Sequence, residues 1–392
     1  MGLFTRQPSD ARHRDGQGRP HDRGKAPPQL CPRSGKRLPS RLIPWVCAFA
    51  LMALPAVADS LRIATYNTEL ARRGPGLLLR DITGGEDAQI NAVITVLTHA
   101  RPDIVALQGF DYDLTGAALA AFAKALEARG LHYPHQVALR PNTGMATGLD
   151  MDGDGRLGGQ RDAQGFGAFS GQGGMAILSR YPVARDAVRD FSGLLWTDLP
   201  DATLPRTDAG PFPSAEAQAA QRLSTTGHWV VPIEVPGTGR ITLLTYHATP
   251  PVFDGPEDRN GLRNADETRF WQLYLDGAFG PVVTDRLVLL GDANLDPDAG
   301  DGHRHVMRAL LNDPRLTDPA PTSAGAAAAG DATDTADWDD PTPGNLRADY
   351  VLPSSDWTVT DSGVLWPLPA DPLAETVATA SRHRLVWVDL TR

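Results

Sequence analysis

The chain has 392 residues, with 37 Lys/Arg against 47 Asp/Glu and a formal net charge of −10. Its two cysteines, Cys31 and Cys47, both lie in the first 58 residues, so the rest of the sequence excludes disulfides, thiolate nucleophiles and Cys-ligated zinc. Because ten of the basic and three of the acidic residues lie in that leader, residues 59–392 keep 27 basic against 44 acidic residues, a net charge of −17. Such an acidic chain repels polyphosphate, so nucleic acid is not a favoured partner without a local basic patch or bridging cations.

The first 58 residues have the features of a targeting segment. A basic, Pro- and Gly-rich stretch ends at Arg41, and the mostly apolar run 42–57 is too short to span a bilayer. Ala56-Val57-Ala58 fits a small-residue cleavage site. We therefore expect residues 1–58 to be a basic leader plus signal peptide, and the mature protein to be secreted or periplasmic and free of the membrane. An uncleaved anchor and a translation start further downstream are the alternatives.

Residues 59–392 are expected to form a single domain, because no internal repeat or long linker divides them. Many strands with few helices favour a two-sheet α/β sandwich over a barrel. The stretch Pro319–Pro343, rich in Ala, Gly, Thr and Asp, is expected to be a surface insertion. The expected elements are strands at 61–66, 104–107, 175–178, 287–290, 348–352 and 385–390, helices at 88–100, about 117–128 and near 265–276, and a hairpin of 229–235 with 240–246.

Polar side chains follow most of these strands. The apolar run Leu287–Leu290 reads as a buried strand, and the turn after it presents Asp292 and Asn294 at the sheet rim. Each such residue alone fits an ordinary turn. Together, two histidines with carboxylates and amides at strand ends are typical of a catalytic site. The other members of this group are Asn67, Gln108 with Asp111 and Asp113, His247, Asp349 and His383.

Residues 61–390 resemble the endonuclease/exonuclease/phosphatase superfamily, which includes exonuclease III-like enzymes and pancreatic-type deoxyribonucleases. The resemblance implies an α/β (α+β) fold, a four-layer sandwich in which two packed mixed β-sheets are flanked by α-helices. It also implies a phosphate-ester hydrolase of nuclease or phosphatase type that uses Mg²⁺ or Mn²⁺. Its carriers, in the family's order, are Ile63–Asn67, Pro102–Gln108, Gly174–Ser179, His247, Gly291–Asn294, Ala348–Leu352 and Ser381 with His383.

The resemblance assigns a role to each of these polar residues. Asp292 would orient or deprotonate the attacking water, and Asn294 and Asn67 would hold the phosphate and the metal shell. His247 and His383, the latter oriented by Asp349, would contact phosphoryl oxygens or exchange protons. A carboxylate that holds an imidazole raises its basicity and fixes its tautomer, which agrees with these roles.

Two positions depart from the family. Gln108 is followed by Gly109, where the family has a Glu that binds metal, and Asp111, Asp113 or Glu69 could replace it. Arg382 stands where the family has Asp, and a guanidinium there would repel a metal ion or grip the substrate phosphate directly. These departures leave a non-catalytic binding module as the alternative to a monomeric phosphoesterase.

An acidic loop starts like a calcium-binding loop. Asp150, Asp152 and Asp154 occupy its first, third and fifth positions, followed by Gly155. Position twelve is Arg161, so the usual bidentate Glu is absent. We expect either a Ca²⁺ site at Asp150 or a solvated Asp/Gly turn.

The loop after His247 is polar and stiffened by prolines. Arg259, Asn260, Arg263 or Asn264 is expected to contact substrate, unless the loop only caps the helix that follows. Three tryptophans are candidate stacking platforms for bases, although packing is the commoner role. They are Trp271, Trp338 and Trp366.

Overall fold

The computed structural model describes residues 60–283 and 285–392, and contacts group residues 57–392 into one compact unit. The predicted leader and signal peptide lie outside the described residues. None of the helices in the described ranges combines the length and the apolar character needed to cross a membrane.

The first sheet has six strands in the order β12-β13-β1-β2-β4-β3. β1 and β2 are parallel and are joined through α2, which confirms the predicted β-α-β unit, and the other neighbours in this sheet are antiparallel. The strands are β1 (Leu61–Leu70), β2 (Ile104–Phe110), β3 (His135–Val137), β4 (Gly174–Ser179), β12 (Thr358–Val364) and β13 (Val386–Thr391).

The second sheet has five strands in the order β11-β10-β9-β8-β5. β8 and β9 form the predicted hairpin, and β10 adds to β9 in parallel. A separate pair, β6 (Arg206–Thr207) with β7 (Gly210–Pro211), lies outside both sheets. The five strands are β5 (Arg189–Asp190), β8 (Gly227–Val235), β9 (Gly239–His247), β10 (Leu287–Asp292) and β11 (Asp349–Pro353).

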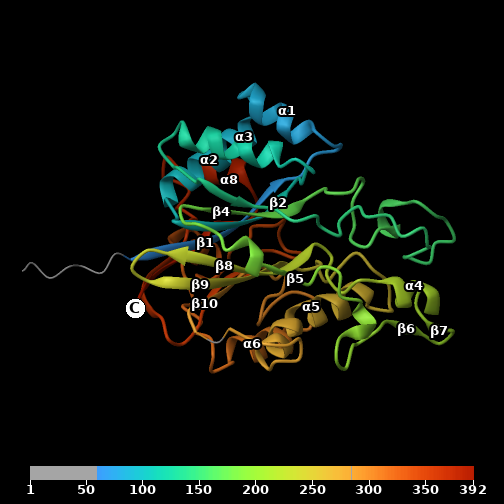
Figure 1. Ribbon diagram of the computed structural model, residues 1–392. Coiled ribbons are helices and arrows are strands. Elements are labelled where there is room, and N and C mark those ends of the chain that lie inside the picture. The colour runs from blue at the N-terminus through green and yellow to red at the C-terminus, as the bar shows by residue number, and fades with distance from the viewer. Residues whose placement is uncertain (1–59, 284) are drawn as a thin grey trace, which may run out of the picture. The chain divides into compact units, whose positions relative to one another are not determined.

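Helices cover the outer faces of the two sheets, which gives four layers (Figure 1). The predicted sandwich of two mixed sheets flanked by helices is confirmed. One group, α1 (Leu77–Gly84), α2 (Ala88–Ala100), α3 (Ala117–Glu127) and α8 (Ala374–Ala380), lies on the first sheet. The other, α5 (Arg259–Leu275) with α6 (Arg304–Leu311), lies on the second sheet, and the short helices α4 (Ala215–Ala220) and α7 (Ala324–Ala329) lie in connecting segments.

Three apolar clusters fill the spaces between the layers, one under each set of helices and one between the sheets. The alternation of side chains along a strand creates them. In β1, Ile63 points into the cluster between the sheets, whereas Ala64 and Tyr66 face the helices. β10 is buried throughout, so the polar residues that matter for function lie at its end.

Two expectations about these elements are corrected. α5 begins at Arg259, six residues before the expected Ala265. The prediction missed its first half because the buried residues there are polar, so the apolar period of a helix is absent. The stretch 319–343 is not simply a surface insertion, since Thr335 and Ala336 are fully buried and Ala336 bridges to His383.

Candidate active site

Five of the polar residues predicted for the site meet at one edge of the two packed sheets. The strand register explains this, because Asp292 pairs with His247 on one side and with Asp349 on the other. β11 is antiparallel to β10, so its first residue rather than its last lies at this edge. The five are Asn67 in β1, His247 and Asp292 at the ends of β9 and β10, Asp349 at the start of β11 and His383 just before β13.

Asp292 is the centre of this group and is completely buried. Its Oδ2 accepts a hydrogen bond of 2.8 Å from Nδ2 of Asn67 and lies 3.4 Å from Nε2 of His247 and 3.8 Å from Nε2 of His383. Its Oδ1 accepts from the backbone N–H of Asn294 at 2.9 Å. Burial alone would raise the pKa of Asp292, but the positive charge of His383 and the contact with His247 hold it below its usual value. Asp292 therefore stays anionic.

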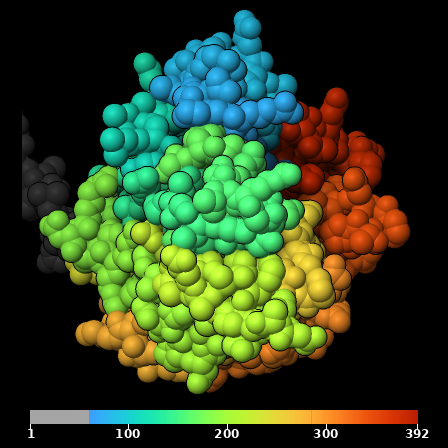
Figure 2. Space-filling model, turned by 90° about the vertical axis from the view of Figure 1, so that its right-hand side faces the viewer, coloured from blue at the N-terminus to red at the C-terminus, as the bar shows by residue number. Residues whose placement is uncertain are grey.

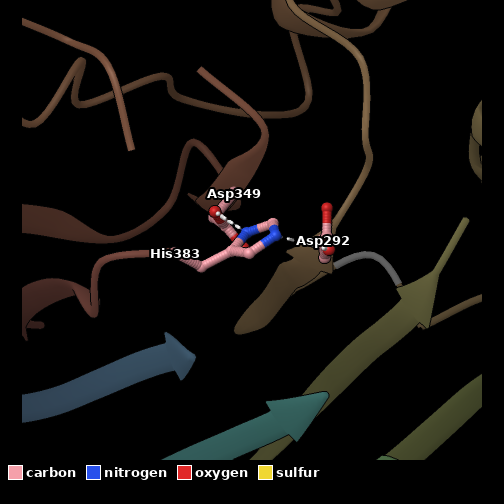
Figure 3. A group of neighbouring side chains, drawn as sticks. All are labelled: Asp292, Asp349 and His383. Atoms are coloured by element: carbon pink, nitrogen blue, oxygen red, sulfur yellow. Dashed lines mark hydrogen bonds and ion pairs between the residues drawn. The ribbon is translucent and has the colours of Figure 1, made fainter. Parts of the chain in front are cut away.

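His383 lies between two carboxylates (Figure 3). Its Nδ1 is 2.9 Å from Oδ2 of Asp349, which also accepts from the hydroxyl of Thr335 at 3.0 Å. Burial opposes a charge on His383, but Asp349 and Asp292 outweigh it and raise the pKa of the imidazole to about 9. His383 is thus an imidazolium at neutral pH. No sequence pattern indicates a role for Thr335, which lies in the segment expected to be a surface insertion.

A cleft of about 460 Å³ opens beside this group. Asp292 has no exposed area and lies behind the lining, so it holds the side chains that face the cleft rather than facing it itself. Figure 2 views the molecule from the side toward which β1 and β2 run, where segments from the N-terminal, middle and C-terminal parts of the chain meet. The polar lining includes Asn67, Glu69, His247, Asn294, Trp338, Arg382 and His383.

The three tryptophans have different surroundings. Trp338 lines the cleft and meets the His383 ring edge-on, with centroids 5.2 Å apart and planes at 88°. Trp271 is fully buried in the cluster under α5, which rules it out as a platform for bases. Trp366 is covered by the guanidinium of Arg384, 4.7 Å from its ring centre. Only the position of Trp338 suits contact with a substrate in this cleft.

The structure places Asp111 and Asp113 away from the cleft, which contradicts the prediction that they replace the missing metal ligand. Asp111 accepts hydrogen bonds from the backbone N–H groups of Arg72 and Gly173 and ties two loops together. Asp113 caps α3, where it accepts from three backbone N–H groups and one hydroxyl. Their oxygens are engaged by these local bonds.

The polar residues at the start of α5 do not line the cleft either. Arg263 is buried and donates to the carbonyls of Gln164, Arg222 and Leu223. Asn264 is also buried and donates two hydrogen bonds to backbone carbonyls. These bonds hold loops against α5. Asn264 has no exposed area, which rules out the predicted contact with substrate, whereas Arg263 also lines a second cavity.

Arg259 and Asn260 line a second cavity of about 380 Å³. This cavity shares Pro250 and Phe253 with the active-site cleft. The Arg259 guanidinium donates to the carbonyl of Met151, and Nδ2 of Asn260 donates to Val252. The two side chains are therefore neighbours of the cleft without being part of it.

The acidic loop brings together a different set of carboxylates from the one expected. Oxygens of Asp150, Asp152 and Asp162 all lie within 4.8 Å of one another, close enough to share an ion. Asp154, the third predicted ligand, instead accepts from the backbone N–H of Arg156. The calcium prediction stays a prediction, with Asp162 in place of Asp154.

Glu69 and Arg382 form an ion pair at the mouth of the cleft. Oε1 of Glu69 accepts from Nε and Nη2 of Arg382, and Oε2 accepts from the Arg382 backbone N–H at 2.8 Å and from the Ser381 hydroxyl at 3.1 Å. Both carboxylate oxygens are thereby engaged. Sequence reasoning named each of the two residues but could not pair them, because they are 313 positions apart.

The sequence model of the endonuclease/exonuclease/phosphatase family matches residues 64–383, from β1 to the terminal histidine. The chain belongs to this family. Members of the family hydrolyse phosphate esters, and they generally depend on a divalent metal ion. No curated protein matches the chain.

The chain is similar to several solved structures, of which the first below supports the same fold. An endonuclease/exonuclease/phosphatase from Beutenbergia cavernae is 20% identical, with a TM-score of 0.50 over 84% of this chain and 71% of that one. Sphingomyelinase C from Streptomyces griseocarneus is 19% identical, with a TM-score of 0.45 over 85% and 100%. A mannosyl-6-phosphatase from Bacteroides thetaiotaomicron is 15% identical, with a TM-score of 0.44 over 85% and 100%.

The residues of the cleft fit a divalent cation poorly. Asp292, Asp349 and His383 have donor atoms within 4.8 Å of one another, but Nδ1 of His383 is already bonded to Asp349, and neither carboxylate has exposed area. Hard cations prefer anionic oxygen ligands, and the carboxylate of Glu69 is already paired with Arg382. β2 supplies no carboxylate to the lining of the cleft, and the other acidic residues of that lining, Asp296, Asp301 and Asp339, come from loops.

Proposed function

We propose that the mature protein is an exported hydrolase of phosphate esters. The observation that carries the proposal is the pair of Asp–His contacts, Asp349–His383 and Asp292–His247, beside a cleft that suits a small ester. The family supports hydrolysis of phosphoesters. The net charge of −17 over residues 59–392 favours a small phosphodiester or phosphomonoester over duplex DNA.

The two histidines are proposed to carry protons in opposite directions. His383, held protonated by Asp349 and Asp292, donates its proton to the leaving oxygen. His247 accepts the proton of the attacking water at Nε2, which lies 3.4 Å from Oδ2 of Asp292, because Nδ1 is buried without a hydrogen-bond partner. Asn67, fixed by its bond to Asp292, donates to a phosphoryl oxygen. In this scheme Asp292 positions the other groups, which agrees with its complete burial.

The test is an assay of the purified mature protein with bis-p-nitrophenyl phosphate, p-nitrophenyl phosphate and plasmid DNA. Each is measured with EDTA and with added Mg²⁺, Mn²⁺ or Ca²⁺. We expect turnover of at least one small ester, and a loss of about 10² to 10⁴ in kcat for His383→Ala. An absence of turnover under every condition, with phosphate still bound, would identify a binding module on the same fold.

Export is a separate part of the proposal. The apolar run and the small residues Ala56-Val57-Ala58 support cleavage after position 58. N-terminal sequencing of the protein recovered from the medium or periplasm should begin at Asp59. Recovery of the full-length chain from the membrane fraction would favour an uncleaved anchor.

A further inference from the structure

The backbone leaves no room for a β2 side chain at the cleft. Gly109 has a left-handed φ of +68°, and Glu69 opposite it has a φ of +49° at an irregularity in the β1–β2 pairing. A Cβ atom on Gly109 would lie 2.5 Å from Oδ1 of Asn67 and 2.9 Å from the backbone nitrogen of Glu69. The two strands thus approach so closely that the position has to be glycine.

Glu69 lines the cleft, and its carboxylate forms an ion pair with Arg382. Its side chain is 24% exposed, whereas that of Arg382 is 62% exposed. The contacts to Nε, Nη2 and the backbone N–H fix the near side of the guanidinium. Within the described residues no hydrogen bond involves Nη1 of Arg382, so this edge is available to a ligand in the cleft.

Arg382 brings a permanent positive charge to the same cleft as Asn67, His247 and His383. A guanidinium presents forked N–H donors that match the oxygens of a phosphate group, and its charge does not depend on pH in the physiological range. The Glu69 carboxylate holds this fork in place, as a carboxylate that fixes a ligand-binding side chain does in other sites.

We propose that Arg382, held by Glu69, binds the phosphate of the substrate as a built-in cation and replaces the divalent metal ion of the family. This inference rests on the proposed function. In the reaction, the water oxygen forms a bond to phosphorus while the ester P–O bond breaks. The water proton passes to His247, and the leaving oxygen takes a proton from His383. Arg382 only donates hydrogen bonds, and the two histidines regain their starting states by proton exchange with solvent.

The first test measures phosphate binding, which needs no turnover. Metal-stripped protein is titrated with inorganic phosphate by calorimetry, in a background with Asp150→Asn and Asp152→Asn that removes the acidic loop as a metal site. Arg382→Gln should weaken phosphate binding about 10-fold or more, and Arg382→Lys should retain part of it. Thermal unfolding checks that the variants are folded. Equal phosphate affinity in Arg382→Gln and its parent overturns the proposal.

The second test measures Mn²⁺ binding in the same background. The parent should show no saturable binding at millimolar Mn²⁺, whereas Arg382→Asp should gain a site, because it frees Glu69 and adds a second carboxylate. The proposal is overturned if the parent binds Mn²⁺ as tightly as Arg382→Asp does and binds phosphate only when Mn²⁺ is present. If the protein hydrolyses esters only when the ion is present, this inference fails and the proposed function holds. If the metal-free protein binds phosphate but hydrolyses no ester, the proposed function fails and this inference holds.

Discussion

Nδ1 of His383 lies 2.9 Å from Oδ2 of Asp349, and neither side chain is more than 5% exposed. Asp349 receives a second hydrogen bond from Thr335, so its carboxylate cannot turn away from the ring without losing both contacts. The pair therefore fixes both the orientation and the charge of the imidazole that points toward Asp292. The acid–base behaviour of the site depends on this contact.

The Asp349→Asn variant tests that dependence. Asp349 is the largest of the charges that raise the pKa of His383 to about 9, so activity of the parent should fall as the pH rises through about 9, where His383 loses its proton. In Asp349→Asn the fall should move to lower pH, and kcat at neutral pH should drop by about 10² or more. The measurement is kcat against pH.

Thr335→Val is the matched control for this experiment. It removes a hydrogen bond to the same carboxylate, and the acceptor of the Ala348 and Asp349 backbone N–H groups, but leaves the charge of Asp349, so the pH profile should move less than in Asp349→Asn. If the dependence of kcat on pH is unchanged in Asp349→Asn, a group other than His383 causes the fall in activity at high pH.

Gly109 and Gly116 form a matched pair for backbone strain. Both have a left-handed φ, +68° and +69°, but a Cβ at Gly116 has nothing within 4 Å. Gly116→Ala should cost about 1 kcal/mol of stability from strain alone. Gly109→Ala should cost about 2–4 kcal/mol and should also lower kcat, because the new methyl group displaces Asn67. Urea unfolding and kinetics at one pH check both effects. If both variants lose the same free energy of unfolding, Asn67 can move away from the new methyl group at no cost.

Arg263 and Arg259 separate structure from substrate binding at α5. Arg263→Met leaves the Leu223 carbonyl without its donor and takes one of two donors from the carbonyls of Gln164 and Arg222, which should reduce the free energy of unfolding by about 2–4 kcal/mol. Arg259→Met removes one such bond at a less buried position and should cost less. Denaturant unfolding measures the difference. A change in KM without a loss of stability in Arg263→Met would restore its predicted role in binding substrate.

The acidic loop provides a prediction about calcium. If Asp150, Asp152 and Asp162 bind Ca²⁺, the Tm of the protein should rise with the Ca²⁺ concentration, since an ion that binds only the folded state stabilises it. Asp152→Asn should abolish the rise. Asp154→Asn, on the same loop but outside the group, should keep it. A Tm that does not respond to millimolar Ca²⁺ would identify the loop as a solvated turn.

The sequence predicts those elements in which apolar residues recur at the period of a helix or a strand along the whole element. The helix 88–100 matches the predicted bounds, since Asp87 caps its start and Arg101 in a left-handed conformation precedes Pro102 at its end. The first half of α5 could not be predicted, because Arg263 and Asn264 are buried polar residues whose partners lie in distant loops.

The site was predictable where residues follow strands, as Asp292 and His247 do. It was not predictable where the function depends on pairing across the chain. Asp111 and Asp113 had the right chemistry close to Gly109, but the turn after β2 directs their carboxylates to backbone N–H groups. The partner of Arg382 is known only once β1 and the segment before β13 lie side by side.

The bond between Asn67 and Asp292 joins the two sheets, because Asn67 belongs to β1 and Asp292 to β10. The proposed catalytic group is thus divided between the two sheets, and each sheet carries only part of it. A slip of one sheet against the other by the length of a hydrogen bond would dismantle the site while each sheet stayed intact. Activity is therefore a direct reporter of how the sheets are packed together, and it should be lost before either sheet unfolds.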